Sequence, residues 1–100
     1  MARAYISGPI SLGDTATAED IERNKESFRM TARYLENAGD VPLSPLVNEG
    51  VGKTWNEYMR LDIALLMTAD KIVMLPGWEH SRGARIEHDL AVALDMQVIE

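Results

Sequence analysis

Short apolar runs alternate with longer amphipathic segments along the whole chain, and this alternation limits the possible folds more than any other feature. We expect strands over residues 4–7, 40–43, 71–75 and 97–99, and helices over residues 18–38, 55–68 and 83–95. The resulting order, β-α-β-α-β-α-β, is typical of a parallel sheet with helices on both faces. The sequence therefore predicts a small α/β domain that spans residues 1–100.

The topology of the sheet follows from a proline and from the handedness of the crossovers. Pro42 lies within the second apolar run and argues for an edge strand, because proline cannot donate to a neighbouring strand. With right-handed crossovers we expect the strand order 2-1-3-4, a shortened flavodoxin-like or Rossmann-like sheet. Ligands of such sheets bind beyond the carboxyl ends of the strands, at the switch point. Here that point is bordered by residues 8–17 and 76–82.

Composition narrows the choice of partners. Ten Lys and Arg residues against sixteen Asp and Glu residues leave a net charge of −6, which argues against a nucleic acid polymer as partner. A free nucleotide remains compatible, since backbone N–H groups at a helix start can bind one phosphate. The chain has no cysteine, no apolar run long enough for a membrane span and no signal-peptide pattern at its beginning, so we expect a cytoplasmic protein.

Two apparent motifs do not carry the chemistry that they resemble. Gly52-Lys53-Thr54 looks like the end of a phosphate-binding P-loop, but the required glycine five residues earlier is Val47. His80 and His88 are eight residues apart rather than four, so they do not form the paired helical zinc motif. We therefore expect neither a metal nor an organic cofactor.

Glu87 is the strongest candidate for a functional residue. It follows Gly83 and precedes Ala91 and Leu94 with the spacing of one helix face, the face that packs inward. A buried carboxylate is costly unless it is paired or hydrogen-bonded. Glu87 is therefore either part of a ligand site at the strand ends, or a half-buried side chain that is bonded to nearby backbone.

Asp62 and Tyr5 are weaker candidates. Asp62 lies in a helix interior, which does not favour aspartate, and the alternative is a solvated side chain paired with Arg60. Tyr5 lies in the first strand, where an inward tyrosine needs a partner for its hydroxyl, and a buried carboxylate would serve. The alternative for Tyr5 is simple core packing.

The last helix and the loop before it supply further candidates. Ser81 can cap the helix or, with the first N–H groups, bind an anion, while Gly83 permits close approach of a ligand. Among the aromatic residues, Trp78 is the best placed to stack on a nucleobase, because it directly follows Pro76-Gly77 in the loop on the ligand side. Trp55 and Tyr58 are more typical of helix packing or of an oligomer contact.

These residues together resemble the nucleoside 2-deoxyribosyltransferase superfamily, which includes the 2′-deoxynucleoside 5′-monophosphate N-glycosidases. The chain is most similar to a short branch of unknown function, the DUF4406-like proteins. The similarity runs along nearly the whole chain and is carried by residues 5–9, 55–62, 69–73 and 81–91.

The resemblance implies a role for each matching residue. Glu87 matches the catalytic nucleophile, Tyr5 the tyrosine that orients it, and Asp62 the aspartate that handles the nucleobase and its proton. Gly8 and Gly83 match glycines that line the sugar or phosphate pocket.

The resemblance also implies a 5′-monophosphate ligand. Ser81 stands where the transferases carry an aspartate that meets the sugar hydroxyl, and where the monophosphate glycosidases carry a serine that contacts phosphate. Ser7 and Ser11 are expected to add phosphate contacts, and Pro9 to border the substrate.

The expected function is therefore cleavage of the N-glycosidic bond of a small nucleotide or nucleoside, by hydrolysis or by base transfer. The resemblance implies a homodimer or larger homo-oligomer, because relatives complete their sites from a neighbouring subunit. Two alternatives stay open: a nucleotide-sensing module without turnover, and an interaction domain whose helix around Trp55, Tyr58 and Met59 docks a partner.

Overall fold

The chain forms a four-stranded α/β domain. A computed structural model describes residues 1–10, 17–49 and 53–100. Its strands and helices follow in the order β1 (Arg3–Ser7), α1 (Ala18–Asn37), β2 (Val41–Leu43), α2 (Trp55–Leu66), β3 (Lys71–Met74), α3 (Arg82–Ala93) and β4 (Gln97–Ile99). Two short 3-10 helices, η2 (Pro45–Asn48) and η3 (Trp78–His80), lie after β2 and β3. Among the described residues, no helix is both long and apolar enough to cross a bilayer.

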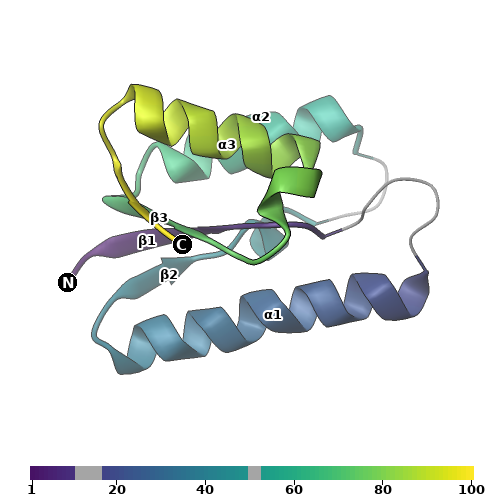
Figure 1. Ribbon diagram of the computed structural model, residues 1–100, viewed down its shortest axis with the longest axis horizontal. Coiled ribbons are helices and arrows are strands. Elements are labelled where there is room, and N and C mark those ends of the chain that lie inside the picture. The colour runs from purple at the N-terminus through teal and green to yellow at the C-terminus, as the bar shows by residue number, and fades with distance from the viewer. Residues whose placement is uncertain (11–16, 50–52) are drawn as a thin grey trace.

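The sheet has the strand order β2-β1-β3-β4, and all three pairings are parallel. This arrangement confirms the predicted α/β fold and the order 2-1-3-4. As expected from its proline, β2 lies at an edge, with Pro42 opposite Ala4 of β1. Helix α1 covers one face of the sheet, and helices α2 and α3 cover the other (Figure 1). The boundary between β1 and β3 is the predicted switch point, because the chain leaves β1 toward β2 and then returns past β1 to β3.

Side chains at the helix starts explain where the helices begin. Thr54 accepts a hydrogen bond from the backbone N–H of Glu57, and the Glu57 carboxylate accepts one from the backbone N–H of Thr54. This is the predicted capping box of α2, which satisfies donors that a helix start leaves open. Ser81 caps α3 in the same sense, with its Oγ accepting from the N–H of Ala84. Gly39, at φ +91°, follows the end of α1 as expected.

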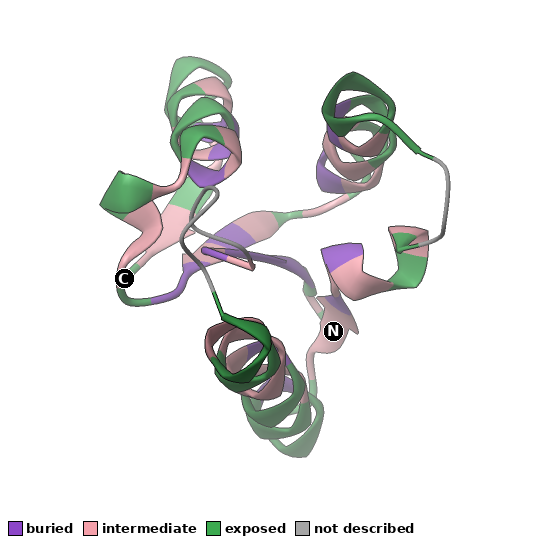
Figure 2. Ribbon diagram, turned by 90° about the vertical axis from the view of Figure 1, so that its right-hand side faces the viewer, coloured by how far each residue is buried: buried purple, intermediate pink, exposed green. Residues whose placement is uncertain are grey.

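Strand β1 divides the core into two halves because successive side chains of a strand point to opposite faces. Ala4 and Ile6 pack with Phe28 of α1 on one face. Tyr5 packs on the other face, in the cluster that α2 and α3 cover. Figure 2 shows the buried residues along the central strands and on the inward sides of the helices. Ser7, two residues after Tyr5, shares its face and is therefore directed toward α3.

The segments after β2 and β3 are partly helical rather than irregular loops. Each contains one turn of 3-10 helix. In η2, Ser44 caps the N–H of Leu46, and Pro45 begins the turn with a backbone angle suited to a helix start. In η3, Gly77 takes a left-handed conformation at φ +87°, and the turn follows it. Such single turns are too short to produce a periodic pattern in a sequence.

The close approach between the end of β1 and the end of β3 yields a stability prediction. A Cβ atom at Gly8 would lie 2.7 Å from Cβ of Leu75, which cannot move without its backbone. We expect Gly8→Ala to lower the free energy of unfolding by about 1–3 kcal/mol, measured by urea denaturation.

Gly83→Ala is the matched control for this substitution. A Cβ atom there would lie 3.0 Å from Sδ of Met59, the end of a flexible side chain. We expect its free energy of unfolding to stay within about 1 kcal/mol of the native protein, because alanine also favours the helix. Equal stability losses in the two variants would contradict the close approach at Gly8.

Candidate functional site

A cavity of about 340 Å³ opens at the carboxyl ends of the strands. Its walls come from the segment after β1, from α1, from the residues around η2, and from α2 and α3. This is the place that the switch point predicts, and the volume is in the range of small-molecule sites. Among the described residues, the charged side chains on its wall are those of Lys25, Glu49, Asp62 and Glu87.

Glu87 lies at the inner end of this cavity, with only 4% of its surface exposed. The hydroxyl of Tyr5 donates to its Oε2 at 2.6 Å, and the hydroxyl of Ser7 donates to its Oε1 at 2.7 Å. Both donors come from the same face of β1, so one strand holds both carboxylate oxygens. Hydrogen bonds to a charged acceptor are stronger than neutral ones, and they fix the orientation of the carboxylate.

The environment of Glu87 brings its ionisation close to neutrality. Burial raises the pKa of Glu87 to about 7, although the hydrogen bonds from Tyr5 and Ser7 lower it in part. The negative charge of Asp62 also raises the pKa of Glu87. Burial and the two carboxylates raise the pKa of Tyr5 far above its usual value, so its hydroxyl keeps its proton. A carboxyl group that titrates near pH 7 is suited to nucleophilic or acid–base chemistry.

Asp62 is a half-buried carboxylate on the α2 side of the same cavity. The side-chain amide of Asn48, from η2, donates to its Oδ1 at 2.9 Å. Burial raises the pKa of Asp62, while the Asn48 hydrogen bond and the charge of Lys53 lower it in part. The cavity thus holds two carboxyl groups, Glu87 and Asp62, that both favour the protonated form more than an exposed acid does.

The start of α3 forms another part of the wall. Ser81 and Gly83 both line the cavity, as does Gly8 after β1. Because the Ser81 Oγ accepts from the N–H of Ala84, its hydroxyl hydrogen is left to donate elsewhere. The absence of a side chain at Gly83 and Gly8 keeps this wall close to the backbone.

Ser7 and Pro9 do not take the places that were expected of them. Ser7 was expected to contact phosphate, but it is 1% exposed and donates to Glu87, so that expectation is corrected. Pro9 is buried and, in the described part of the chain, is not among the cavity-lining residues. Ser11 lies outside the described residues.

Trp78 does not line the cavity either. Its ring stacks on His88 with the ring centroids 4.2 Å apart, and its Nε1 donates to Oε1 of Glu100 at 3.0 Å. The turn η3 carries this side chain against the core instead. The aromatic side chains that do line the cavity are Trp55 and Tyr58 of α2, which the sequence favoured less.

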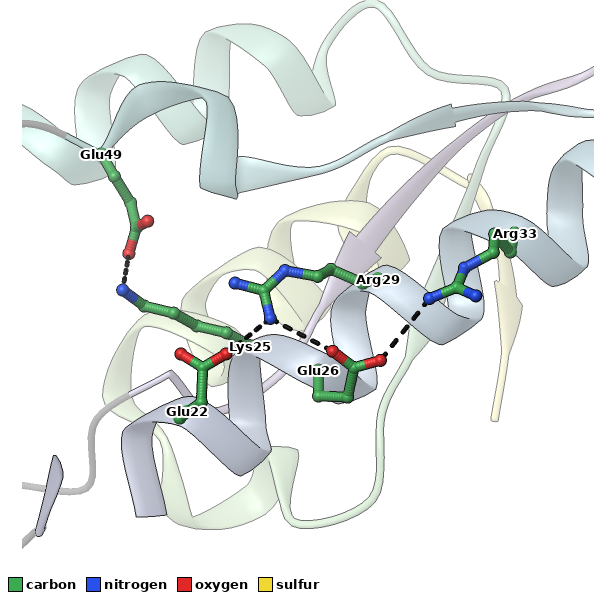
Figure 3. A network of polar contacts seen from close by, with 6 residues as sticks. All are labelled: Glu22, Lys25, Glu26, Arg29, Arg33 and Glu49. Carbon is green, nitrogen blue, oxygen red and sulfur yellow. Dashed lines mark hydrogen bonds and ion pairs between the residues drawn. The ribbon is translucent and has the colours of Figure 1, made fainter. Parts of the chain in front are cut away.

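Cations lie beside the mouth of the cavity. Lys25 of α1 forms an ion pair with Glu49 at 3.0 Å, and both side chains line the cavity. Figure 3 shows this pair next to a second group on α1, in which Arg29 bridges Glu22 and Glu26. The guanidinium of Arg82 lies 4.3 Å from the centre of the Trp55 ring.

Sequence reasoning did not identify Asn48, Lys25 or Glu49 as site residues. Each lies outside the recognisable motifs, and only the packing of η2 and α1 at the strand ends brings it to the cavity. Within residues 1–10, 17–49 and 53–100, no group of three or more His, Cys, Asp or Glu side chains is arranged to hold a metal ion.

Comparison with known proteins places this fold and site in context. The family profile described as "Domain of unknown function (DUF4406)" matches residues 2–100. No curated protein matches the chain.

Two solved structures share the fold. One is a 2-desoxiribosyltransferase from Leishmania mexicana, with a TM-score of 0.64, 19% identity, and coverage of 98% of this chain and 62% of that one. The other is a conserved protein from Enterococcus faecalis V583, with a TM-score of 0.69, 19% identity, and coverage of 98% and 61%. The chain therefore spans less than two thirds of the length of these structures. The expected likeness to the deoxyribosyltransferase superfamily is confirmed for the fold.

The buried position of Glu87 predicts a specific dependence of stability on pH. Its pKa is about 7 in the folded protein and 4.5 ordinarily, so the unfolded chain releases this proton first. The stabilising contribution is complete below about pH 4.5 and is lost as the pH rises through about 7. Relative to Glu87→Gln, we expect the free energy of unfolding of the native protein to fall by up to about 3 kcal/mol over that window.

Urea denaturation of both proteins at several pH values measures this difference. The exposed Glu36, changed to Gln, is the control. The free energy of unfolding of this variant should differ from that of the native protein by the same amount throughout the window. A flat difference for Glu87→Gln as well would show that position 87 does not carry a buried titrating carboxyl group.

Proposed function

The chain is a member of this DUF4406 family of unknown function, and we propose that it cleaves the N-glycosidic bond of a small deoxynucleotide or nucleoside. Glu87 is the nucleophile in this proposal. The observation that carries it is the buried Glu87 carboxylate, held by two hydroxyl groups at the inner end of the cavity. The fold shared with a 2-desoxiribosyltransferase adds support.

In the first step, the sugar lies with its anomeric carbon against a carboxylate oxygen of Glu87. As the bond from C1′ to the base nitrogen breaks, positive charge develops on the sugar, and the carboxylate stabilises it and then bonds to C1′. The electron pair of the broken bond stays on the base, which takes a proton from the carboxyl group of Asp62. Tyr5 and Ser7 are positioning residues that direct the carboxylate.

In the second step, an acceptor releases the sugar from Glu87. Water attacks C1′, its proton passes to the carboxylate of Asp62, and the C1′–oxygen bond to Glu87 breaks with its electron pair returning to the carboxylate. A second nucleobase in place of water gives base transfer instead. The raised pKa of Asp62 suits a group that donates a proton in one step and accepts one in the next.

A 5′-monophosphate is the favoured substrate in this proposal. Ser81 has a hydroxyl hydrogen available, and the first N–H groups of α3 adjoin the cavity beside Gly83. A helix N-terminus attracts anions through these N–H groups and through the helix dipole. Trp55 and Tyr58, rather than Trp78, are the aromatic side chains that line the cavity, and in this proposal they contact the base.

The proposal includes a homo-oligomer. The cavity is open in the single chain, and a neighbouring subunit would close it against water. Such closure strengthens the electrostatic interactions of Glu87 and Asp62 with the reacting sugar. No metal or organic cofactor takes part in the proposed steps, because the two carboxyl groups supply both the nucleophile and the proton.

Release of free base is the direct test of this function. Deoxynucleoside monophosphates and deoxynucleosides are incubated with the protein, and free base is followed by chromatography. We expect release from at least one monophosphate, with Glu87→Gln lowering the rate by about a thousandfold or more. Glu36→Gln, an exposed change of the same chemistry, should leave the rate unchanged.

Other outcomes of the same test distinguish the alternatives. Tight binding without release, little altered by Glu87→Gln, would replace the enzyme by a nucleotide-sensing module. Neither binding nor release in a well-folded protein would leave an interaction domain as the better explanation.

The pH dependence of kcat/KM tests the role of the Tyr5 hydroxyl group. Because Glu87 must be ionised to act as nucleophile, activity should rise as the pH increases through about 7. Tyr5→Phe removes a hydrogen bond that lowers the pKa of Glu87, so we expect this rise to move to higher pH. An unshifted profile with a lower plateau would contradict a positioning role for Tyr5 through Glu87.

A further inference from the structure

One ion pair of the cavity wall has no part in the proposed mechanism. Nζ of Lys25, from α1, lies 3.0 Å from Oε1 of Glu49, the residue after η2, and both side chains line the cavity. Figure 3 shows Lys25 reaching toward Glu49, with Arg29 engaged separately by Glu22. The Lys25–Glu49 pair is thus the part of this charge network that borders the ligand space.

Glu49 directly follows Asn48, the residue that contacts the group proposed to handle the leaving base. Asn48 donates to Asp62 at 2.9 Å, and its backbone carbonyl accepts from Nζ of Lys53 at 2.8 Å. The first contact ties the residue before Glu49 to Asp62, and the second ties its backbone to Lys53. In the proposed mechanism, the leaving base that meets Asp62 therefore lies in the same cavity as Glu49 and Lys25.

A ligand can replace this ion pair at little cost. The side chains of Lys25 and Glu49 are 25% and 39% exposed, and partly exposed ion pairs contribute little to stability. The ammonium group of Lys25 only donates hydrogen bonds, and the carboxylate of Glu49 only accepts them, through two oxygens. A ligand edge that complements Lys25 and Glu49 has one hydrogen-bond acceptor followed by two adjacent hydrogen-bond donors.

We propose that Lys25 and Glu49 are specificity-determining residues that select guanine as the leaving base. Among the common nucleobases, guanine alone presents a carbonyl oxygen, a ring N–H and an amino group in a row. The carbonyl accepts from Lys25, and the two donors meet the two oxygens of Glu49, a bidentate arrangement with a charged acceptor. This assignment rests on the proposed function, since it places the base beside Asp62.

The experiment compares deoxyguanosine monophosphate with deoxyinosine monophosphate, whose base differs only in lacking the amino group. Dissociation constants are measured by calorimetry, and kcat/KM by base release. We expect the native protein to favour the guanine nucleotide by about tenfold or more in both measurements. Glu49→Gln should bring this ratio close to one, because the second acceptor for the two donors is lost.

Two further variants separate recognition from a general structural effect. Lys25→Met should weaken the binding of both nucleotides by about tenfold, because both bases carry the carbonyl oxygen. The ratio of their two dissociation constants should stay unchanged. Glu22→Gln alters the neighbouring ion pairs at a residue that does not line the cavity. It should change neither the dissociation constant nor kcat/KM of either nucleotide. Thermal unfolding of each variant checks that the fold is retained.

The outcomes distinguish this inference from the proposed function. Base release from all common monophosphates with equal kcat/KM, or a guanine preference that Glu49→Gln does not alter, would overturn the recognition and leave the function standing. Binding of the guanine nucleotide that depends on Glu49, without any base release, would support the recognition and overturn the function.

Discussion

The organisation of the site depends on the burial of one carboxylate. Glu87 and its hydroxyl partners on β1 are separated by 80 and 82 positions in the chain, yet they meet at hydrogen-bonding distance in the core. A buried acid without such partners would be strongly destabilising. The two hydroxyl groups reach Glu87 only when α3 packs on the sheet in this position. The packing of α3 and the orientation of the Glu87 carboxylate therefore depend on each other.

Parallel pairing is what brings the remaining groups to that carboxylate. All four strands run in the same direction, so the segments that leave them gather at one edge of the sheet. Asp62 reaches this edge from α2, and Ser81 and Gly83 reach it from the start of α3. Residues with no sequence pattern in common thus share one cavity, because topology rather than sequence distance decides their proximity.

The charges of the cavity are arranged by depth. Glu87 lies at the buried end, and the partly exposed ion pair between Lys25 and Glu49 lies toward solvent. Burial raises the pKa of the inner acids, whereas the outer pair stays partly exposed to solvent and contributes little to stability. One small cavity therefore holds a buried acid at one end and a partly exposed ion pair at the other.

The sequence by itself determined the strand order, the edge position of β2, and the inward face of α3 that carries Glu87. These features follow from periodicity, from one proline and from crossover handedness, all of which are local or general. It also indicated Tyr5 as a hydroxyl in need of a partner. Only the tertiary structure decided that Ser7 serves Glu87, that Trp78 packs on His88, and that Asn48, Lys25 and Glu49 border the cavity. These positions depend on single turns and on packing between distant elements, for which no periodic signal exists in the chain.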